Sequence, residues 1–224
     1  MDNKVTEPGK LKDGSGVARV ALVFTAVILA MTFSYFFLDR QLAVFLHPYL
    51  NGVPFFVWLT YSVNPLAPAA SIIAAFIAAR ALARGTLTHN ESALLRLSCA
   101  ILIAGVLTHE LKEVFGRAWP ETWIDKNPSY FGNGTYGFFP FHGGRGFASF
   151  PSGHTTAAAA FAGAVWSLWP RLRWLGVALV LIEAIGLLAA DYHWLSDIMA
   201  GAAVGIATGV VAARVGRTND TGSV

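Results

Sequence analysis

The 224-residue sequence has little charge and a single cysteine, and each shortage excludes a class of protein. Charged residues make up 13% of the chain and hydrophobic residues 55%, whereas an ordinary soluble protein has about 25% and about 45–50%. We therefore do not expect a soluble globular domain. The single cysteine, Cys99, excludes an intrachain disulfide framework and a metal site built from several thiolates.

The basic residues exclude one kind of partner. There are 16 Lys and Arg residues against 13 Asp and Glu residues, so the net charge is only +3. The basic residues are scattered along the chain, whereas nucleic-acid-binding proteins gather them on one face or along one helix. We therefore expect no nucleic acid partner.

Long apolar runs are abundant in this sequence. A helix needs about 20 apolar residues to cross the hydrocarbon core of a bilayer. Several runs are rich in Ala and Gly, which allow helices to pack closely in lipid. The sequence therefore predicts an all-α fold, a polytopic membrane protein with six transmembrane helices. These runs cover residues 16–38, 66–82, 93–111, 154–169, 174–190 and 198–213.

The basic residues predict the orientation of these helices. If the six runs alternate across the membrane, most of the 16 Lys and Arg residues lie on the side of both termini, and the positive-inside rule makes that side cytoplasmic. We expect cytoplasmic tails at 1–15 and 216–224 and a membrane domain at 16–215, in the cytoplasmic membrane. The basic residues on this side are Lys4, Lys10, Lys12, Arg19, Arg80, Arg84, Arg96, Arg171, Arg173, Arg214 and Arg217.

A cleaved signal peptide is the alternative interpretation of the first run. That interpretation is disfavoured because the run is longer than the roughly 7–15 residues of a signal-peptide core. No small-residue cleavage motif follows it either.

Two polar stretches are expected on the outer side. Residues 112–152 are rich in Gly, Pro, Asn and aromatic residues, which predicts an ordered, turn-rich extracytoplasmic loop between the third and fourth helices. Residues 39–64 are expected to form an amphipathic element along the outer membrane surface.

The motif FPSGHT occupies residues 150–155, where the long loop meets the fourth run. A helix that begins there leaves backbone N–H groups unpaired, and these groups together with the helix dipole attract an anion. His154 would lie in the first turn of that helix. The alternative is a capped helix whose histidine simply lies at the membrane interface.

A second cluster, DYHWLSD, occupies residues 191–197. His193 and Asp197 are four residues apart, so in a helical turn they share one face. The carboxylate can then accept a hydrogen bond from one ring nitrogen, which leaves the other nitrogen free to attack an electrophile. Taken by itself, this pair also fits a solvated pair at a helix end.

The expected topology favours a catalytic role for these two motifs over a helix cap and a solvated surface pair. The fourth and fifth runs are joined by the short turn 170–173, so they are expected to be antiparallel neighbours. This brings His154 and His193 to one membrane face, and Lys112 and Arg117 reach the same level from the third run. Two histidines, a carboxylate and two cations beside a helix N-terminus predict a phosphoryl-transfer site.

The segments KEVFGRAWP, PSGH and HWLSD, in this order on six membrane segments, resemble the type-2 phosphatidic acid phosphatase family of integral membrane lipid phosphatases. The family pattern is K-x6-R-P, then P-S-G-H, then S-R-x5-H-x3-D, and the match spans residues 112–205. The resemblance implies that His193 forms a phosphohistidine, Asp197 orients it and His154 protonates the leaving alcohol. It also implies that no metal and no cofactor take part. The phosphate-binding residues that it implies are Lys112, Ser152 and Gly153.

The chain departs from the family pattern at both motif arginines. Trp119 stands where the first arginine is expected, and Leu187 stands where the second is expected. Arg117 and Arg145 are the candidates to replace them, and Arg117 is favoured because it lies only two residues before Trp119. A guanidinium can bind a phosphate through two parallel hydrogen bonds, so one arginine with a lysine and several amides can suffice.

The predicted function is that of a membrane lipid phosphatase. It would hydrolyse a lipid phosphate monoester or pyrophosphate at the outer face of the cytoplasmic membrane. Its expected partners are a membrane lipid as substrate and the lipid bilayer. One alternative is a phosphotransferase with the same intermediate and another acceptor. The other is a non-catalytic lipid-binding homologue, which the retained His154, His193 and Asp197 disfavour.

One acidic residue lies inside an apolar run. Glu183 falls in the middle of the fifth run, where a charge costs at least roughly 2.5 kcal/mol. It is therefore expected to face other helices, with a structural hydrogen bond favoured over a functional role.

Overall fold

The computed structural model describes residues 14–124 and 126–216, and the described residues form helices and connecting segments without a strand. The expected all-α fold is confirmed. Most of the two expected cytoplasmic tails, with Lys4, Lys10, Lys12 and Arg217, lies outside the described residues.

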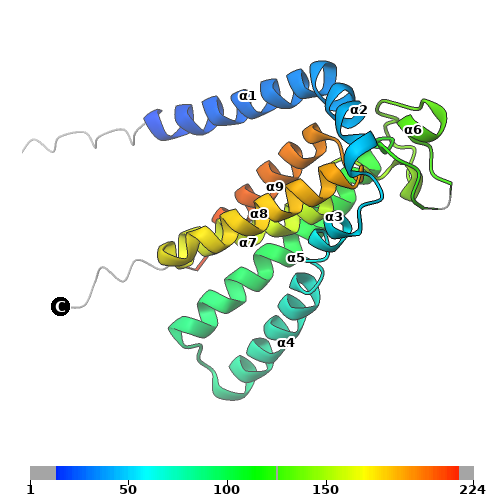
Figure 1. Ribbon diagram of the computed structural model, residues 1–224. Coiled ribbons are helices and arrows are strands. Elements are labelled where there is room, and N and C mark those ends of the chain that lie inside the picture. Colours follow the sequence, from blue (N-terminus) through cyan, green and yellow to red (C-terminus); the bar gives the residue numbers. More distant parts are fainter. Residues whose placement is uncertain (1–13, 125, 217–224) are drawn as a thin grey trace, which may run out of the picture.

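The longer helices form a bundle, and the short α-helices lie at one end of it (Figure 1). The longer helices are α1 (Gly14–Phe37), α2 (Asp39–Leu50), α4 (Leu66–Arg84), α5 (His89–Phe115), α7 (Gly153–Leu168), α8 (Arg173–Ala189) and α9 (Leu195–Arg214). The short ones are α3 (Pro54–Leu59), α6 (Tyr130–Asn133) and the 3-10 turns η1 (Arg145–Phe147) and η2 (Pro170–Leu172).

Five helices within the described ranges are long and apolar enough to cross a membrane, namely α1, α4, α5, α8 and α9. The chain is therefore a multi-pass membrane protein, but the expected count of six spanning helices is not confirmed. The difference lies in α7, which has 16 residues. At about 1.5 Å per residue it is about 24 Å long, which is less than the roughly 30 Å of a hydrocarbon core.

Helix α7 is the central helix of the bundle. It contacts α5, α8 and α9, and about half of its residues are buried. On α9 the glycines Gly201, Gly205 and Gly209 face α7. A Cβ atom at Gly201 would lie 2.6 Å from the carbonyl oxygen of Ser152, and the other two would also meet α7 backbone. Small residues thus allow the two backbones to approach closely, with both helices beginning at the same end of the bundle.

Local signals set the ends of α5, which carries Lys112 in its last turn. At its start, the Thr88 hydroxyl accepts from the Glu91 amide, and the Glu91 carboxylate accepts from the Thr88 amide at 2.9 Å. This capping box satisfies two backbone donors. At its end, Gly116 has φ +54°, and a Cβ there would collide with the carbonyl of Phe139.

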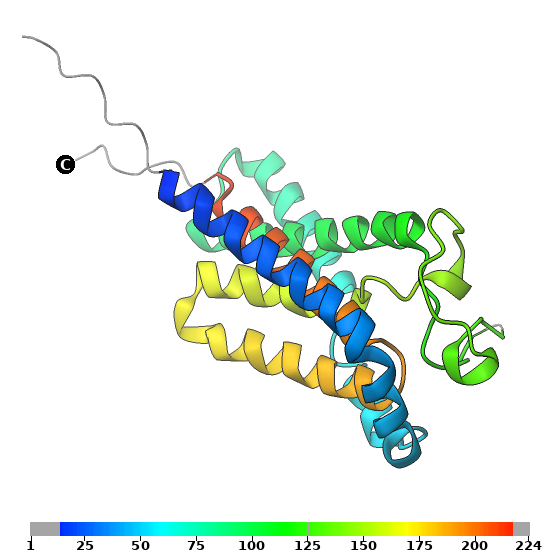
Figure 2. The same cartoon turned by 90° about the horizontal axis from the view of Figure 1, so that it is seen from above.

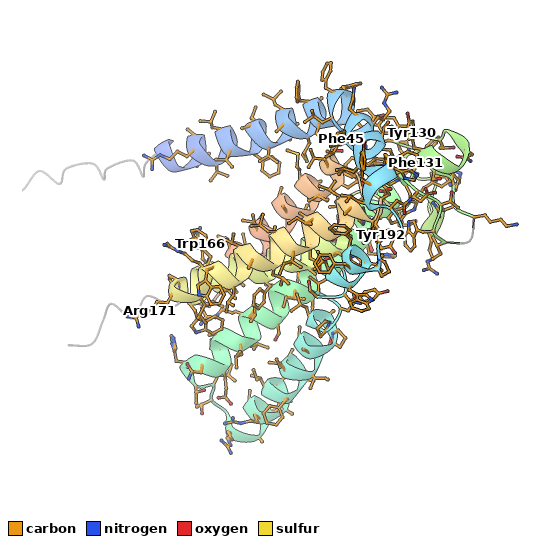
Figure 3. All side chains as sticks on the ribbon, in the orientation of Figure 1. Phe45, Tyr130, Phe131, Trp166, Arg171 and Tyr192 are labelled. Atoms are coloured by element: carbon orange, nitrogen blue, oxygen red, sulfur yellow. The ribbon has the colours of Figure 1, made fainter. Side chains whose placement is uncertain are left out.

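The two polar stretches lie at one end of the bundle. Residues 39–64 form α2 and α3 followed by turns, and the expected loop begins at 116, because α5 continues to Phe115. The loop is ordered by α6, η1 and isolated bridges such as the one between Arg117 and Phe138. Figure 3 shows Tyr130, Phe131 and Tyr192 at this end and Trp166 and Arg171 at the other. Figure 1 and Figure 2 show that α1 begins at the end of the molecule at which α9 ends.

Candidate active site

A cavity of about 600 Å³ lies where α5 ends and α7 begins. Cavities that bind small molecules have volumes of roughly 300–1,000 Å³. Four of the expected site residues line it, namely Lys112, Gly153, His154 and His193. The remaining lining residues are Thr60, Tyr61, Val63, Asn64, Ala67, Trp119, Trp123, Ala157, Leu187 and Tyr192.

His193 lies in the short turn between α8 and α9 and is buried. Its Nδ1 atom is 3.4 Å from Oδ2 of Asp197, so the expected pairing is present, although His193 precedes α9 and the two residues do not share a helical turn. Burial lowers the pKa of His193, and the charge of Lys112 acts in the same direction, while Asp197 opposes the shift. The imidazole is therefore held neutral, with a lone pair on its second nitrogen.

Asp197 lies in the first turn of α9 and is completely buried. Its carboxylate accepts hydrogen bonds from the Trp194 amide at 3.1 Å, from the Ser149 hydroxyl at 2.5 Å and from the Arg117 guanidinium. These three donors fix the direction in which the carboxylate faces His193.

His154 lies in the first turn of α7 and reaches the cavity that His193 also lines. The turn η2 connects α7 to α8, and these two helices contact each other. The expected convergence of the two histidines at one end of adjacent helices is therefore confirmed.

Lys112 lies beside the first turn of α7. Its Nζ donates to the carbonyl of Ala148 at 2.6 Å and lies 5.4 Å from the centre of the Trp119 ring. A Cβ atom built on Gly153 would lie 4.0 Å from the same Nζ. The ammonium group and the start of a helix therefore form one positively polarised region.

Ser152 precedes α7 but does not line the cavity. Its amide donates to the carbonyl of Asp197 at 3.1 Å, and its hydroxyl accepts from the Thr155 amide and hydroxyl at 3.4 and 3.1 Å. The residue is thus a helix cap, and its backbone donor is already used. The amides of Gly153 and His154, which precede the first intrahelical hydrogen bond, are the donors available to an anion.

Arg117 is completely buried and does not line the cavity. Its guanidinium donates to Asp197, to Asp39 at 2.6 Å and to Ser196 at 2.7 Å. Burial disfavours the charge, but Asp197 and Asp39 raise the pKa of Arg117 above its ordinary value. The expectation that Arg117 binds the phosphate therefore disagrees with the geometry. Its position in the sequence correctly placed it near the site, but its side chain pairs with Asp197 and Asp39 and points away from the cavity.

Arg145 lies in η1, is exposed and does not line the cavity. Its backbone carbonyl accepts a hydrogen bond of 2.9 Å from the indole of Trp119, which does line the cavity. The segment that carries Arg145 thus borders the site, and a contact of its side chain with phosphate stays a prediction.

The two positions where the family has arginines both line the cavity. Trp119 and Leu187 are buried there and form apolar walls. Trp119 also packs against Trp123 with ring centres 4.9 Å apart, and Trp123 packs against Tyr192 at 5.4 Å. Lys112 is the only Lys or Arg among the lining residues, all of which belong to the described part of the chain.

Sequence reasoning assigned no role to three residues that pair with Asp197 or with its partner Arg117, namely Asp39, Ser149 and Ser196. Asp39 is a buried carboxylate at the first position of α2. The one signal in the sequence was an acidic residue directly after a long apolar run. Its partners Arg117 and Ser196 are distant in the chain, so no motif spacing indicated them.

Glu183 faces the protein interior, as expected. The hydroxyl of Ser62 donates to its Oε1 at 2.5 Å, which confirms the expected structural hydrogen bond. Within residues 14–124 and 126–216, no group of three His, Cys, Asp or Glu side chains is arranged to hold a metal ion. Chemistry without a metal stays a prediction.

Comparisons with known proteins place the chain in a family. The sequence model of the PAP2 superfamily matches residues 93–220. A lipid A 1-phosphatase of Rhizobium etli is 36% identical over 132 residues, which cover 54% of this chain and 50% of the relative. A lipid A 1-phosphatase of Rhizobium johnstonii is 36% identical over 128 residues, which cover 52% and 46%.

The chain thus spans about half the length of the curated relatives it matches. Among solved structures, a transmembrane PAP2 type phosphatidylglycerolphosphate phosphatase from Bacillus subtilis matches with a TM-score of 0.36 and 18% identity, over 88% of this chain and 87% of that one. The family match alone covers more than half of this chain and includes most of the cavity's polar residues. The chain belongs to the PAP2 superfamily.

Proposed function

We propose that this protein is a membrane lipid phosphatase that hydrolyses a phosphate monoester through a phosphohistidine on His193. The observation that carries the proposal is that His154 and His193 line one cavity with Lys112 and the first turn of α7. Membership of the PAP2 superfamily supports phosphatase chemistry, as do the relatives named lipid A 1-phosphatases.

The phosphate group would bind between Lys112 and the start of α7. An ammonium group has three donors, and one of them already bonds to the carbonyl of Ala148. The other two donors and the amides of Gly153 and His154 can hold the phosphate oxygens, since a helix N-terminus favours an anion.

In the first step His193 attacks phosphorus. Its Nε2 lone pair forms the N–P bond as the bond from phosphorus to the lipid oxygen breaks, and His154 gives a proton to the departing oxygen. Burial lowers the pKa of His154 to about 4, so the negative charge of the bound phosphate has to raise that pKa for His154 to carry the proton. The His193 imidazole becomes positively charged. Asp197, which accepts from Nδ1, compensates that charge.

In the second step water releases the phosphate. His154, now neutral, takes a proton from a water molecule as the water oxygen attacks phosphorus and the N–P bond breaks. Inorganic phosphate leaves, and both histidines return to their first protonation states. A lipid or sugar hydroxyl in the place of water would give phosphotransfer.

The cavity wall favours a monoester over a pyrophosphate. Two positions that carry arginine in the family are apolar here, and Lys112 is the only Lys or Arg side chain that lines the cavity within the described part of the chain. A second phosphoryl group would add negative charge without a further cation beside it. Because both curated relatives are named for lipid A, its 1-phosphate is the first substrate to test.

The cavity would face the outside of the cytoplasmic membrane. Arg84 ends α4, Arg214 ends α9 and Arg171 lies in η2, where α7 turns into α8. Figure 3 shows Arg171 at the end of the bundle opposite to Tyr192, which lines the cavity. The positive-inside rule makes the arginine-rich end cytoplasmic.

The proposal is tested by measuring phosphate release with the purified protein in detergent and a chelator present. The substrates are lipid A carrying a 1-phosphate, phosphatidic acid, phosphatidylglycerophosphate and a prenyl pyrophosphate. We expect release from at least one monoester and its loss in His193→Ala and His154→Ala. His142→Ala, an exposed histidine outside the cavity, is the matched control and should keep full activity.

Unchanged release by His193→Ala would show that the mechanism is wrong. Transfer of phosphate to an added lipid alcohol, without release to water, would identify a phosphotransferase. Binding of these lipids without either reaction would identify a non-catalytic homologue.

A further inference from the structure

A second buried carboxylate lies behind the histidine that attacks phosphorus. Asp39 begins α2 and has only 1% of its surface exposed. Its carboxylate accepts from the hydroxyl of Ser34 at 2.9 Å, from the amide and hydroxyl of Ser196 at 3.0 and 2.5 Å and from Arg117 at 2.6 Å. Such complete pairing indicates a buried, ionised carboxylate.

Arg117 joins this carboxylate to Asp197. Its Nη1 donates to Asp197 and its Nη2 to Asp39, and the side chains of both ion pairs have 0% exposure. Aromatic rings surround the guanidinium and keep water away from it. These rings belong to Tyr35, Tyr136, Phe138 and Trp194, with centres 5.1, 5.6, 4.9 and 5.5 Å from its central carbon.

The charges in this cluster do not cancel. One guanidinium faces two carboxylates, so the group of Asp39, Arg117 and Asp197 carries one net negative charge while His193 is neutral. If Asp39 were uncharged, Arg117 alone would balance Asp197. Charges interact more strongly in a buried, water-poor site than in water. The net negative charge of the cluster therefore stabilises a positive charge on the His193 imidazole.

His193 needs that negative charge because the other charged groups near it are positive or become so. Lys112 reaches it from α5, and His154 lines the same cavity from α7. Lys112 disfavours a positive imidazole on His193, and His154 does so whenever it carries a proton. Asp197, on α9, is the anion in contact with it, and its net effect depends on how far Arg117 compensates it.

We propose that Asp39 is a positioning residue of the active site, which holds Arg117 so that the negative charge of Asp197 remains available to His193. The proposal rests on the proposed function, since it takes His193 as the group that attacks phosphorus. It assigns a role to the junction of α1 and α2, which lies outside the segment that the superfamily model matches.

Asp39→Asn tests the proposal because it keeps the shape and one acceptor oxygen but removes the charge. We expect kcat to fall by about tenfold, which corresponds to about one pKa unit in the stability of the positive imidazole. KM should stay nearly constant. In ¹⁵N NMR spectra of the labelled protein, the His193 ring, assigned with His193→Ala, should titrate at lower pH than in the wild type.

Two further variants separate charge from structure. Ser34→Ala removes a neutral partner of Asp39 and leaves all charges in place, so the titration and kcat should not change. The double variant Asp39→Asn with Arg117→Gln removes one charge of each sign and leaves Asp197 uncompensated. It should return the titration of His193 to the wild-type pH or above.

A titration of His193 that is identical in wild type and Asp39→Asn would overturn the proposal, even if kcat fell. If Asp39→Asn does not fold, the double variant decides, because a titration well below the wild-type pH contradicts the charge argument. Full activity of His193→Ala would instead contradict the proposed function. If His193→Ala loses activity while Asp39→Asn keeps the activity and the His193 titration of the wild type, only the proposed role of Asp39 is wrong.

Discussion

The two sides of His193 differ in how their charges are compensated. On the protein side, Asp39, Arg117 and Asp197 form buried ion pairs with 0% side-chain exposure. On the cavity side, Lys112 faces a wall in which Trp119 and Leu187 occupy the family's arginine positions. The ion pairs on the protein side of this proposed nucleophile are thus buried, while the proposed substrate side keeps one ammonium group and the start of a helix. We expect changes behind His193 to affect turnover and changes in the cavity to affect binding.

The largest effect is expected for Asp197→Asn. The amide keeps the size of the side chain but loses the charge that compensates the positive imidazole, and it leaves Arg117 with one carboxylate fewer. By analogy with the buried carboxylate of a serine protease triad, kcat should fall by about a thousandfold or more. Phosphate release under saturating lipid measures it. Ser149→Ala, which removes a neutral donor to the same carboxylate, should cost far less, and an equal loss would contradict the electrostatic role.

A smaller effect, on KM and not on kcat, is expected for Lys112→Met. Removing a charged hydrogen-bond donor costs about 1.5–3 kcal/mol, so KM should rise by about tenfold to a hundredfold. Lys112→Arg restores the charge and should recover part of the affinity. A fall in kcat with unchanged KM would show that Lys112 acts on the chemical step.

Trp123→Ala tests whether the aromatic wall of the cavity, formed by Trp119, Trp123 and Tyr192, contributes to substrate binding. Trp123 lines the cavity with 43% of its surface exposed and packs against Trp119 and Tyr192. Loss of an aromatic contact worth about 0.5–1.5 kcal/mol should raise KM by about two- to tenfold at constant kcat. Trp166→Ala, at the opposite end of the bundle, is the matched control. Equal effects of both variants would remove the aromatic wall from substrate binding.

The smallest effect is expected when the pH is lowered from neutral to 6.5, where His193 should change kcat/KM little. Because burial lowers the pKa of His193, the folded protein keeps this imidazole neutral at a pH where an ordinary histidine is half protonated. The acid limb that His193 contributes to the pH profile of kcat/KM should therefore lie below pH 6.5. The unfolded chain binds this proton first, so the stability contributed by neutral His193 is present above about pH 6.5 and is lost as the pH falls toward the lowered pKa.

Thermal unfolding followed between pH 7 and pH 5 checks the same statement about stability. His193→Ala should show a weaker loss of stability toward acid than the wild type. An equally steep loss in the variant would show that other groups cause it.

Much of the fold was predictable from composition and local patterns. Apolar runs identified the positions of α1, α4, α5, α8 and α9, because a chain in lipid must satisfy its backbone hydrogen bonds within each segment. The count of spanning helices was not predictable in the same way. The run at 154–169 is apolar enough, but it forms the 16-residue α7, which packs among other helices. An apolar run does not distinguish burial in lipid from burial in protein.

The sequence by itself determined the helical membrane class, and the spacing of His193 and Asp197 indicated that they pair. They do pair, but His193 lies in the turn before α9 and not on a shared helical face. Only the tertiary structure decided which arginine lies where. Arg117 meets Asp39 across 78 residues of chain and Asp197 across 80. Those contacts depend on how α2, the loop and α9 pack against one another, and no local spacing encodes that packing.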